Sequence, residues 1–272
     1  MKIPFTKMSG SGNDFILIDN RDSIIKPNQK REFVKKVCVP KMSVGADGVI
    51  FIENSDKADF RWDFYNSDGG SAEMCGNGGR CVARYAYEKQ IAPRRKLSFE
   101  TLAGIIQAEV DGKSVKVWLT PPSDFREGIE VELDGVSYSI DAVNTGVPHA
   151  VIFSKDLDDD SVRRIGSGVR FHRAFAPAGT NVNFVEVRDR HRLKVRTYER
   201  GVEGETLACG TGVVASALVA ARGNRVEPPV QVETLGGDIV NVCFDESSNG
   251  SFGEVCLEGL TKTVFEGTLV EL

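Results

Sequence analysis

Apolar and polar residues alternate in the segment that leads up to Cys75. Residues 60–65 place aromatic side chains at every second position, a period of two that predicts a half-buried strand. Residues 66–70 have the composition of a turn, and residues 80–87 predict a helix with a small apolar face. Cys75 therefore lies at a glycine-lined helix start, where backbone N–H groups and the helix dipole favour a thiolate.

The same pattern returns in the second half of the chain. Residues 193–198 alternate again, and a glycine-rich stretch around Cys209 precedes the helix-like run 213–221. Three pairs of markers lie 134 positions apart: Cys75-Gly-Asn-Gly and Cys209-Gly-Thr-Gly, Gly45-Ala46-Asp47 and Gly179-Thr180-Asn181, and Gly12 and Gly146. Markers that keep one order and one offset predict an internal duplication, and hence two related domains.

The rest of the pattern predicts mainly strands, with helices over 28–38 and 156–166. The expected strands are near 5–8, 15–18, 49–53, 97–100, 105–110, 115–119, 129–133, 136–143, 149–153, 182–187, 230–233, 239–244 and 253–257. The proline-containing stretch 120–124 is the predicted domain junction. We expect domains over 1–119 and 120–261, with a last strand, 262–272, returning to the first domain.

Bulk properties narrow the function classes. The chain has 272 residues, 41% of them hydrophobic and 27% charged, as in ordinary globular proteins. A net charge of −5 argues against nucleic acid as the main partner. No apolar run reaches the roughly 18–20 residues of a membrane span, and the N-terminus lacks the apolar core of a signal peptide. We therefore expect a cytoplasmic protein with no membrane partner.

The cysteines fall into two groups. With no CxxC spacing and three histidines among 272 residues, we expect no metal site and no need for disulfides. Those predicted to be small core residues, from their Val-rich or helix-inner positions, are Cys38, Cys81, Cys243 and Cys256. Cys75 and Cys209 differ, because each precedes a Gly-x-Gly helix start.

Two duplicated domains that face each other would bring both helix starts to one cleft. A thiolate on one side of a bound molecule and a thiol on the other can remove a proton and return one from the opposite face, which inverts a stereocentre. Alternatives fit less well. The glycine loops lack the Lys-Ser/Thr of a phosphate loop, neither cysteine has a CxxC partner for redox chemistry, and His149, His172 and His191 show no triad pattern.

Four motifs taken together resemble the diaminopimelate epimerase family. They are Lys7-Met-Ser-Gly-Ser-Gly-Asn-Asp-Phe15, Tyr65-Asn-Ser-Asp-Gly69 with Cys75-Gly-Asn-Gly-Gly-Arg80, Gly146-Val-Pro-His149, and Tyr198-Glu-Arg-Gly201 with Gly204-Glu-Thr-Leu-Ala-Cys-Gly-Thr-Gly212. The resemblance implies an α+β fold of two pseudo-symmetric domains, each an antiparallel sheet or barrel around a central helix. It also implies a metal-free, cofactor-independent homodimeric epimerase that converts LL-2,6-diaminopimelate to the meso form for lysine and peptidoglycan synthesis.

The resemblance also implies roles for individual residues. Cys75 and Cys209 match the acid/base pair, and His149 and Glu199 match positions that tune the pKa values of the cysteines. The positions that match substrate contacts are Asn13, Asn66, Gly76, Asn77, Asn181, Glu199, Arg200, Gly210 and Thr211. Arg200 suits a bidentate grip on the distal carboxylate and Glu199 suits the ammonium group. A hydrogen-bonded core histidine stays open as the alternative for His149, and a plain surface charge as the alternative for Arg200.

The chain departs from some family members at Gly48, where they have Gln, and at Val147, where they have Asn. The segment from Glu199 to Cys209 is one residue longer than in some of them. Two other functions stay open at this point. One is a two-cysteine racemase for proline, hydroxyproline or histidine. The other is a non-catalytic amino-acid-binding protein or thiol-based sensor.

Overall fold

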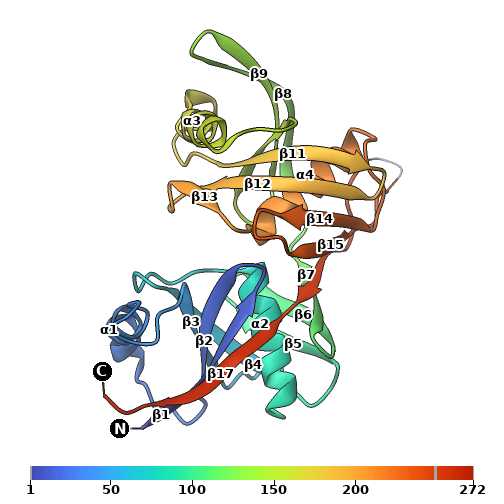
Figure 1. The fold of residues 1–272 in the computed structure, drawn as a ribbon. Coiled ribbons are helices and arrows are strands. Elements are labelled where there is room, and N and C mark those ends of the chain that lie inside the picture. The colour runs from blue at the N-terminus through green and yellow to red at the C-terminus, as the bar shows by residue number, and fades with distance from the viewer. Residues whose placement is uncertain (1, 248–249, 272) are drawn as a thin grey trace. The chain divides into compact units, whose positions relative to one another are not determined.

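The computed structural model describes residues 2–247 and 250–271 and separates the chain into two compact units. Unit 1 comprises Met1–Trp118 and Glu258–Leu272, and unit 2 comprises Leu119–Leu257 (Figure 1). The chain passes between the units twice, once within β7 (Ser114–Leu119) and once within β16 (Val255–Leu260).

Unit 1 is a mixed sheet with two helices. Its elements are β1 (Ile3–Gly10), β2 (Asn13–Asp19), α1 (Pro27–Val37), β3 (Gly48–Glu53), β4 (Phe60–Asn66), α2 (Gly76–Glu88), β5 (Lys96–Thr101), β6 (Gly104–Asp111), β7 and β17 (Lys262–Leu269). The strands pair in the order β17–β1–β2–β3–β4–β5–β6–β7. The pairs β2–β3 and β4–β5 are parallel and the others antiparallel. The C-terminal strand thus lies beside the first one (Figure 1).

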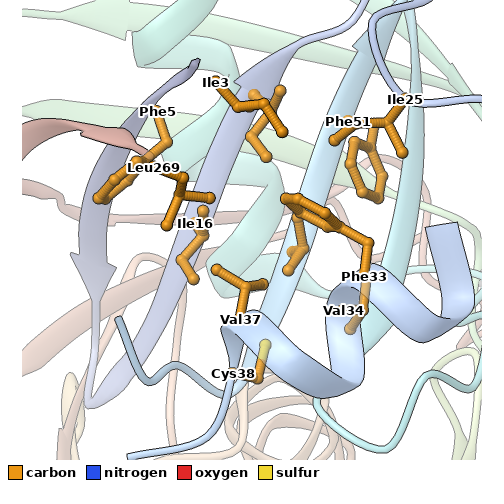
Figure 2. Close-up of a cluster of buried hydrophobic side chains, with 12 residues drawn as sticks. Ile3, Phe5, Ile16, Ile25, Phe33, Val34, Val37, Cys38, Phe51 and Leu269 are labelled. Carbon is orange, nitrogen blue, oxygen red and sulfur yellow. The ribbon is translucent and has the colours of Figure 1, made fainter. Parts of the chain in front are cut away.

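The two helices of unit 1 play different parts. α2 is the central helix, because its residues 76–86 are all buried and it packs against β1, β2, β5 and β6. α1 covers the face of the sheet that points away from α2. It begins with Pro27, whose fixed φ suits the first turn of a helix. Its buried positions recur at helical spacing at Lys30, Phe33, Val34 and Val37. The apolar residues among these join the core cluster with Phe51 shown in Figure 2.

Unit 2 repeats this topology. Its elements are β8 (Ser123–Leu133), β9 (Val136–Asn144), β10 (Pro148–Phe153), α3 (Asp159–Arg170), a 3-10 turn (Arg173–Phe175), β11 (Asn181–Asp189), β12 (Arg192–Glu199), β13 (Gly204–Thr206), α4 (Gly210–Arg222), β14 (Val230–Thr234), β15 (Ile239–Cys243) and the start of β16. The order β9–β10–β11–β12–β14–β15 has parallel pairs at β10–β11 and β12–β14, as unit 1 has at β2–β3 and β4–β5. α4 is the central helix and is buried over 212–221.

The predicted α+β class with two sheet units around central helices is confirmed, and the sheets are mixed rather than purely antiparallel. α3 begins at Asp159, later than expected, because the Asp158 carboxylate accepts the Ser161 N–H at 2.6 Å and caps the helix there. The strand β13 was not predicted. Within the described residues, no helix is both long and apolar enough to cross a membrane.

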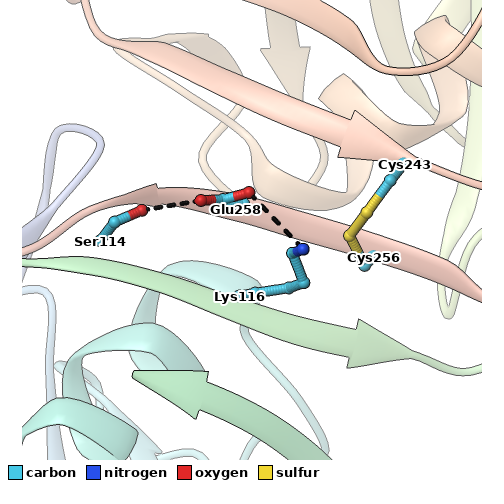
Figure 3. Close-up of a disulfide and its surroundings, with 5 residues drawn as sticks. All are labelled: Ser114, Lys116, Cys243, Cys256 and Glu258. Carbon is cyan, nitrogen blue, oxygen red and sulfur yellow. Dashed lines mark hydrogen bonds and ion pairs between the residues drawn. A yellow bond between two sulfur atoms is a disulfide. The ribbon is translucent and has the colours of Figure 1, made fainter. Parts of the chain in front are cut away.

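One cysteine prediction is wrong. Cys243 and Cys256 are not simple core thiols but form a disulfide between β15 and β16 (Figure 3). The sequence does not reveal this pairing, because it depends on the two strands bringing their Cα atoms within 5.0 Å of each other. Cys38 and Cys81 are confirmed as buried core residues. Beyond the disulfide, Glu258 on β16 accepts a hydrogen bond from Ser114 at 3.0 Å within unit 1 (Figure 3).

Candidate active site

The Cys75 site is the N-terminus of α2. Cys75 is the N-cap residue, and its Sγ accepts the Gly78 N–H at 3.4 Å. Gly78 packs closely on the sheet, since a Cβ there would lie 3.3 Å from Ile50 and 3.5 Å from Phe15. The glycine therefore lets the helix start press against the sheet, with the sulfur at the open end of the helix dipole.

A polar network in unit 1 joins two predicted substrate contacts to this helix start. The Asn77 amide donates to Asn13 Oδ1 at 2.8 Å, and Asn13 in turn donates to Asp47 at 2.9 Å. Arg80, which is fully buried, donates to Asn77 Oδ1 at 2.9 Å and to Ser11 Oγ at 2.7 Å. The two asparagines are thus held in fixed orientations.

Asn66 lies next to the Asp47 end of this network, since it pairs with Gly48 in the β3–β4 register and Ser67 donates its backbone N–H to the Asp47 carbonyl at 2.8 Å. It is the last residue of β4, is exposed, and exchanges backbone hydrogen bonds with Gly69 and Gly70 at 2.8 Å across a turn. Its side chain is available to solvent at the end of the strand.

The Cys209 site is the N-terminus of α4. Cys209 is the N-cap residue and is 8% exposed, and its Sγ lies 3.5 Å from the Thr211 hydroxyl. Thr145 anchors this turn by donating to the Thr211 carbonyl at 3.0 Å. Gly212 corresponds to Gly78, and a Cβ there would overlap the Asn183 side chain.

His149 lies directly behind this helix start. It is 1% exposed, and its Nε2 is 2.9 Å from the Thr211 hydroxyl. Burial, and secondly the positive charge of Arg200, lower the pKa of His149 to about 3. The ring is therefore neutral at physiological pH, so it carries no charge but can form a hydrogen bond with Thr211.

Asn181, Glu199 and Arg200 meet at neighbouring strand ends in unit 2. Asn181 pairs with His149 in the β10–β11 register, and its Oδ1 accepts the Arg200 backbone N–H at 2.8 Å. Glu199 is the final residue of β12, immediately before Arg200, and both are partly exposed. The guanidinium lies 3.4 Å from the Ala178 carbonyl. Unit 2 thus gathers its predicted site residues around the start of α4 and the adjacent strand ends.

Cys38 and Cys81 are the other two free cysteines of the described residues, and both are buried. Burial raises the thiol pKa of Cys38 to about 12, and the carboxylates of Asp14 and Asp47 act in the same direction. Burial likewise raises the thiol pKa of Cys81 to about 12. These thiols stay protonated at neutral pH and do not act as nucleophiles or bases. In the part of the chain that the structure describes, no three His, Cys, Asp or Glu residues are grouped as metal ligands.

Three residues at the two helix starts were given no role from the sequence. Arg80 lies one turn after Asn77, a spacing that places both on one helix face. Asn183 and Thr197 pair with each other beneath the first turn of α4. Asn183 carried a usable signal, because it is a lone amide inside the apolar run of β11 and must find partners there.

Comparisons with known proteins agree on one family. A family model described as "Diaminopimelate epimerase" matches residues 5–123 and 141–257. A diaminopimelate epimerase from Aquifex aeolicus is 49% identical, with 98% of each chain covered. One from a Hydrogenobaculum species is 47% identical, with 97% of each chain covered.

Solved structures share the fold at low sequence identity. A phenazine biosynthesis protein of the PhzF family from Bacillus anthracis aligns over all of both chains with a TM-score of 0.79 and 16% identity. A hydroxyproline epimerase from Agrobacterium vitis aligns with a TM-score of 0.72 and 15% identity, over 98% of this chain and 91% of that one. At these identities the likeness concerns the fold alone.

Proposed function

Because the chain belongs to the diaminopimelate epimerase family, we propose that it is an isomerase that converts LL-2,6-diaminopimelate into the meso form. The observation that carries the proposal is the presence of one cysteine at the N-cap of each central helix, α2 and α4, in a chain nearly half identical to named epimerases. The duplication supplies two matched sulfurs, as inversion of one carbon requires.

In the proposed reaction, a thiolate on one of Cys75 and Cys209 removes the α-proton of the amino acid. A C–H bond breaks and an S–H bond forms. The other cysteine, as a thiol, gives its proton to the opposite face of the same carbon, so its S–H bond breaks and a new C–H bond forms. The two sulfurs exchange protonation states and the stereocentre inverts. Only two proton transfers occur, and we propose no cofactor or metal for them.

Negative charge builds on the substrate carboxylate when the α-proton leaves, and the helix starts can stabilise it. The first N–H groups of a helix have no intrahelical acceptor. We propose that those of Gly76 and Asn77 in α2, and of Gly210 and Thr211 in α4, donate to this carboxylate. Donors that are already fixed in place lower the cost of forming the carbanion, in the way that an oxyanion hole works.

The distal amino-acid group of the substrate needs its own contacts. We propose that Arg200 binds the distal carboxylate and that Glu199 binds the distal ammonium group. Asn13, Asn66 and Asn181 add amide contacts. The strand-end position of Glu199 and Arg200 supports this assignment, because both side chains are partly exposed beside the His149 and Asn181 pair.

The sequence relatives favour this substrate over the rivals. Eight diaminopimelate epimerases with 36–49% identity span most of the chain, whereas the hydroxyproline epimerase shares 15% identity and hence only the fold. We further propose, from the family resemblance, that the enzyme is a cytoplasmic homodimer whose product serves lysine and peptidoglycan synthesis. Sedimentation of the purified protein at the mass of a single chain would contradict the dimer.

The decisive experiment follows deuterium incorporation at the α-carbon in D₂O. Wild type should incorporate deuterium into both LL- and meso-diaminopimelate and not into proline, hydroxyproline or histidine. Cys75→Ala and Cys209→Ala should each abolish epimerisation. Cys81→Ala is the matched control, because Cys81 lies on the same helix as Cys75 but is buried, and it should stay active. Wild-type incorporation by both single variants would refute the mechanism, and ligand binding without exchange in wild type would favour the binding-protein alternative.

Oxidation gives a second test of the same mechanism. If both sulfurs reach one substrate carbon, an oxidant should inactivate the enzyme by joining Cys75 to Cys209, and a reductant should restore it. Mass spectrometry of the inactivated protein identifies the linkage. Inactive protein that keeps both thiols reduced would count against their close approach.

A further inference from the structure

A chain of buried and half-buried polar groups runs from the sheet of unit 2 to the Cys209 sulfur. Its first member, Asn183, is fully buried in β11. Its Nδ2 lies 3.0 Å from the Ala150 carbonyl, which can only accept, and its Oδ1 accepts from the Thr197 hydroxyl at 3.0 Å. These two partners fix which end of the amide is the donor.

The orientation of Asn183 determines the tautomer of His149. Asn183 Nδ2 is also 3.1 Å from His149 Nδ1. Because the amide nitrogen is a donor, Nδ1 must accept. The imidazole is neutral, so its single proton is on Nε2, which lies 2.9 Å from the Thr211 hydroxyl. His149 therefore donates to Thr211.

The last step concerns the Thr211 hydroxyl. Its oxygen accepts the His149 proton, which leaves its own hydrogen to be donated elsewhere. Cys209 Sγ lies 3.5 Å from this oxygen. If that hydrogen points at the sulfur, the donors run in one direction, from Asn183 through His149 and Thr211 to Cys209.

We propose that Asn183 is a positioning residue that, by holding the His149 tautomer, aims the Thr211 hydroxyl at Cys209 Sγ as a hydrogen-bond donor. The effect of this positioning role on catalysis rests on the proposed function, whereas the hydrogen-bond geometry does not. A donor aimed at the sulfur stabilises the thiolate over the thiol. Thr211 thus acts on Cys209 through its side chain, separately from the backbone N–H proposed to bind substrate.

The first test reads the tautomer directly. Nitrogen NMR of protein labelled with ¹⁵N-histidine, with His149 assigned from a His149→Gln variant, should show the ring proton on Nε2 in wild type. Asn183→Leu keeps the side-chain volume close but removes the amide, and should give a mixture of tautomers. A wild-type ring protonated on Nδ1 would overturn the proposal.

The second test measures the pH midpoint of alkylation of each cysteine by iodoacetamide, with peptide mass spectrometry as the readout. In Thr211→Val and Asn183→Leu the Cys209 midpoint should rise by about one pH unit, while Cys75 in the same sample stays unchanged. Thr211→Ser keeps the hydroxyl and should restore the wild-type midpoint. Thr197→Val is the matched control, since it removes a buried hydroxyl beside Asn183 but keeps the amide bonds to His149 and Ala150.

An unchanged Cys209 midpoint in Thr211→Val, or a shift of the same size in Thr197→Val, would overturn the proposal. Arg200, the charged residue that acts on His149, is kept in all of these variants. Neither test requires turnover. If the epimerase assay fails while tautomer and midpoints behave as stated, only the proposed function is refuted; the reverse outcome refutes only the positioning role.

Discussion

The two units build the same helix start on different supports. Phe15, Ile50 and Trp62 lie beneath the first turn of α2. Phe64 pairs with Ile50 in the strand register and its ring contacts Phe15 edge-on, with the ring centroids 5.9 Å apart, so the whole set is apolar. At the corresponding places in the strand register beneath α4 lie His149, Asn183 and Thr197, a hydrogen-bonded set.

The comparison separates what both helix starts require from what one of them adds. Both keep a cysteine at the N-cap and a glycine as the third helical residue, packed closely on the sheet. These features place a sulfur at a helix dipole and bring the helix down onto the strands. The hydrogen-bonded set beneath α4, here called the polar support, is not needed for that geometry, because unit 1 achieves it with apolar side chains. In the role proposed above, its His149 and Asn183 members direct a hydrogen bond toward Cys209.

The largest effect we expect comes from the disulfide, which belongs to unit 2. Cys243 and Cys256 are separated by 13 residues, and a bridge that closes a loop of this size contributes about 3 kcal/mol to the free energy of unfolding. Reduction should lower the urea midpoint of unit 2 and leave that of unit 1 in place. Hydrogen exchange of peptides from each unit, followed along the urea titration, measures this.

A Cys243→Ser/Cys256→Ser double variant is the control, because reductant should no longer change its stability. If both units lose protection together on reduction, they unfold as one cooperative body. Effects of substitutions at the two helix starts would then have to be compared through global stability alone.

A smaller effect should distinguish the two glycines. A methyl group at position 212 overlaps the Asn183 amide, which is held by Thr197 and by His149 and cannot retreat. Gly212→Ala should therefore cost about 2–3 kcal/mol of unfolding free energy through overpacking. Gly78→Ala places its methyl 3.3–3.5 Å from Ile50, Trp62 and Phe15, so these side chains need to shift by only a few tenths of an ångström, and the gain in helix propensity offsets most of that strain.

Thermal and urea unfolding of the two variants, side by side, test this difference. Equal losses of unfolding free energy would mean that the Asn183 amide under α4 moves aside as readily as the apolar side chains under α2. The polar support would then not be rigid enough to direct a hydroxyl toward Cys209.

Much of this architecture could be predicted from local pattern. The alternation in β4 and β12 and the Cys-Gly-x-Gly motifs located both helix starts, because strand period and helix-start chemistry are properties of a few neighbouring residues. The duplication was visible for the same reason, as its markers recur in the sequence itself.

What the sequence did not reveal depends on pairing between distant strands. Asn183 meets Thr197 only because β11 and β12 are in that register, and the disulfide forms only because β15 and β16 bring their cysteines together. Arg80 could be seen in its motif, but its role in holding Asn77 and Ser11 follows from its complete burial. The roles assigned to Asn66, Glu199 and Arg200 stay predictions until substrate is tested.

The smallest effect we expect comes from the one support residue that can titrate, since His149 stands where unit 1 has Phe15. Its folded-state pKa of about 3 is below the ordinary 6.5, so below pH 6.5 the unfolded chain binds a proton that the folded protein does not. Stability is therefore full above pH 6.5 and falls as the pH drops toward 3, by about 2 kcal/mol between pH 7 and pH 5.

The His149→Gln variant should lose that part of the acid sensitivity. The urea midpoint should therefore fall less between pH 7 and pH 5 in the variant than in wild type. His191→Gln is the matched control, because it removes a histidine of the same unit that is exposed to solvent. If His149→Gln is as acid-sensitive as wild type, the ring accepts a proton in the folded state. An imidazolium has no acceptor nitrogen left for the Asn183 amide, so the one-directional donor chain to Cys209 would fail at its second step.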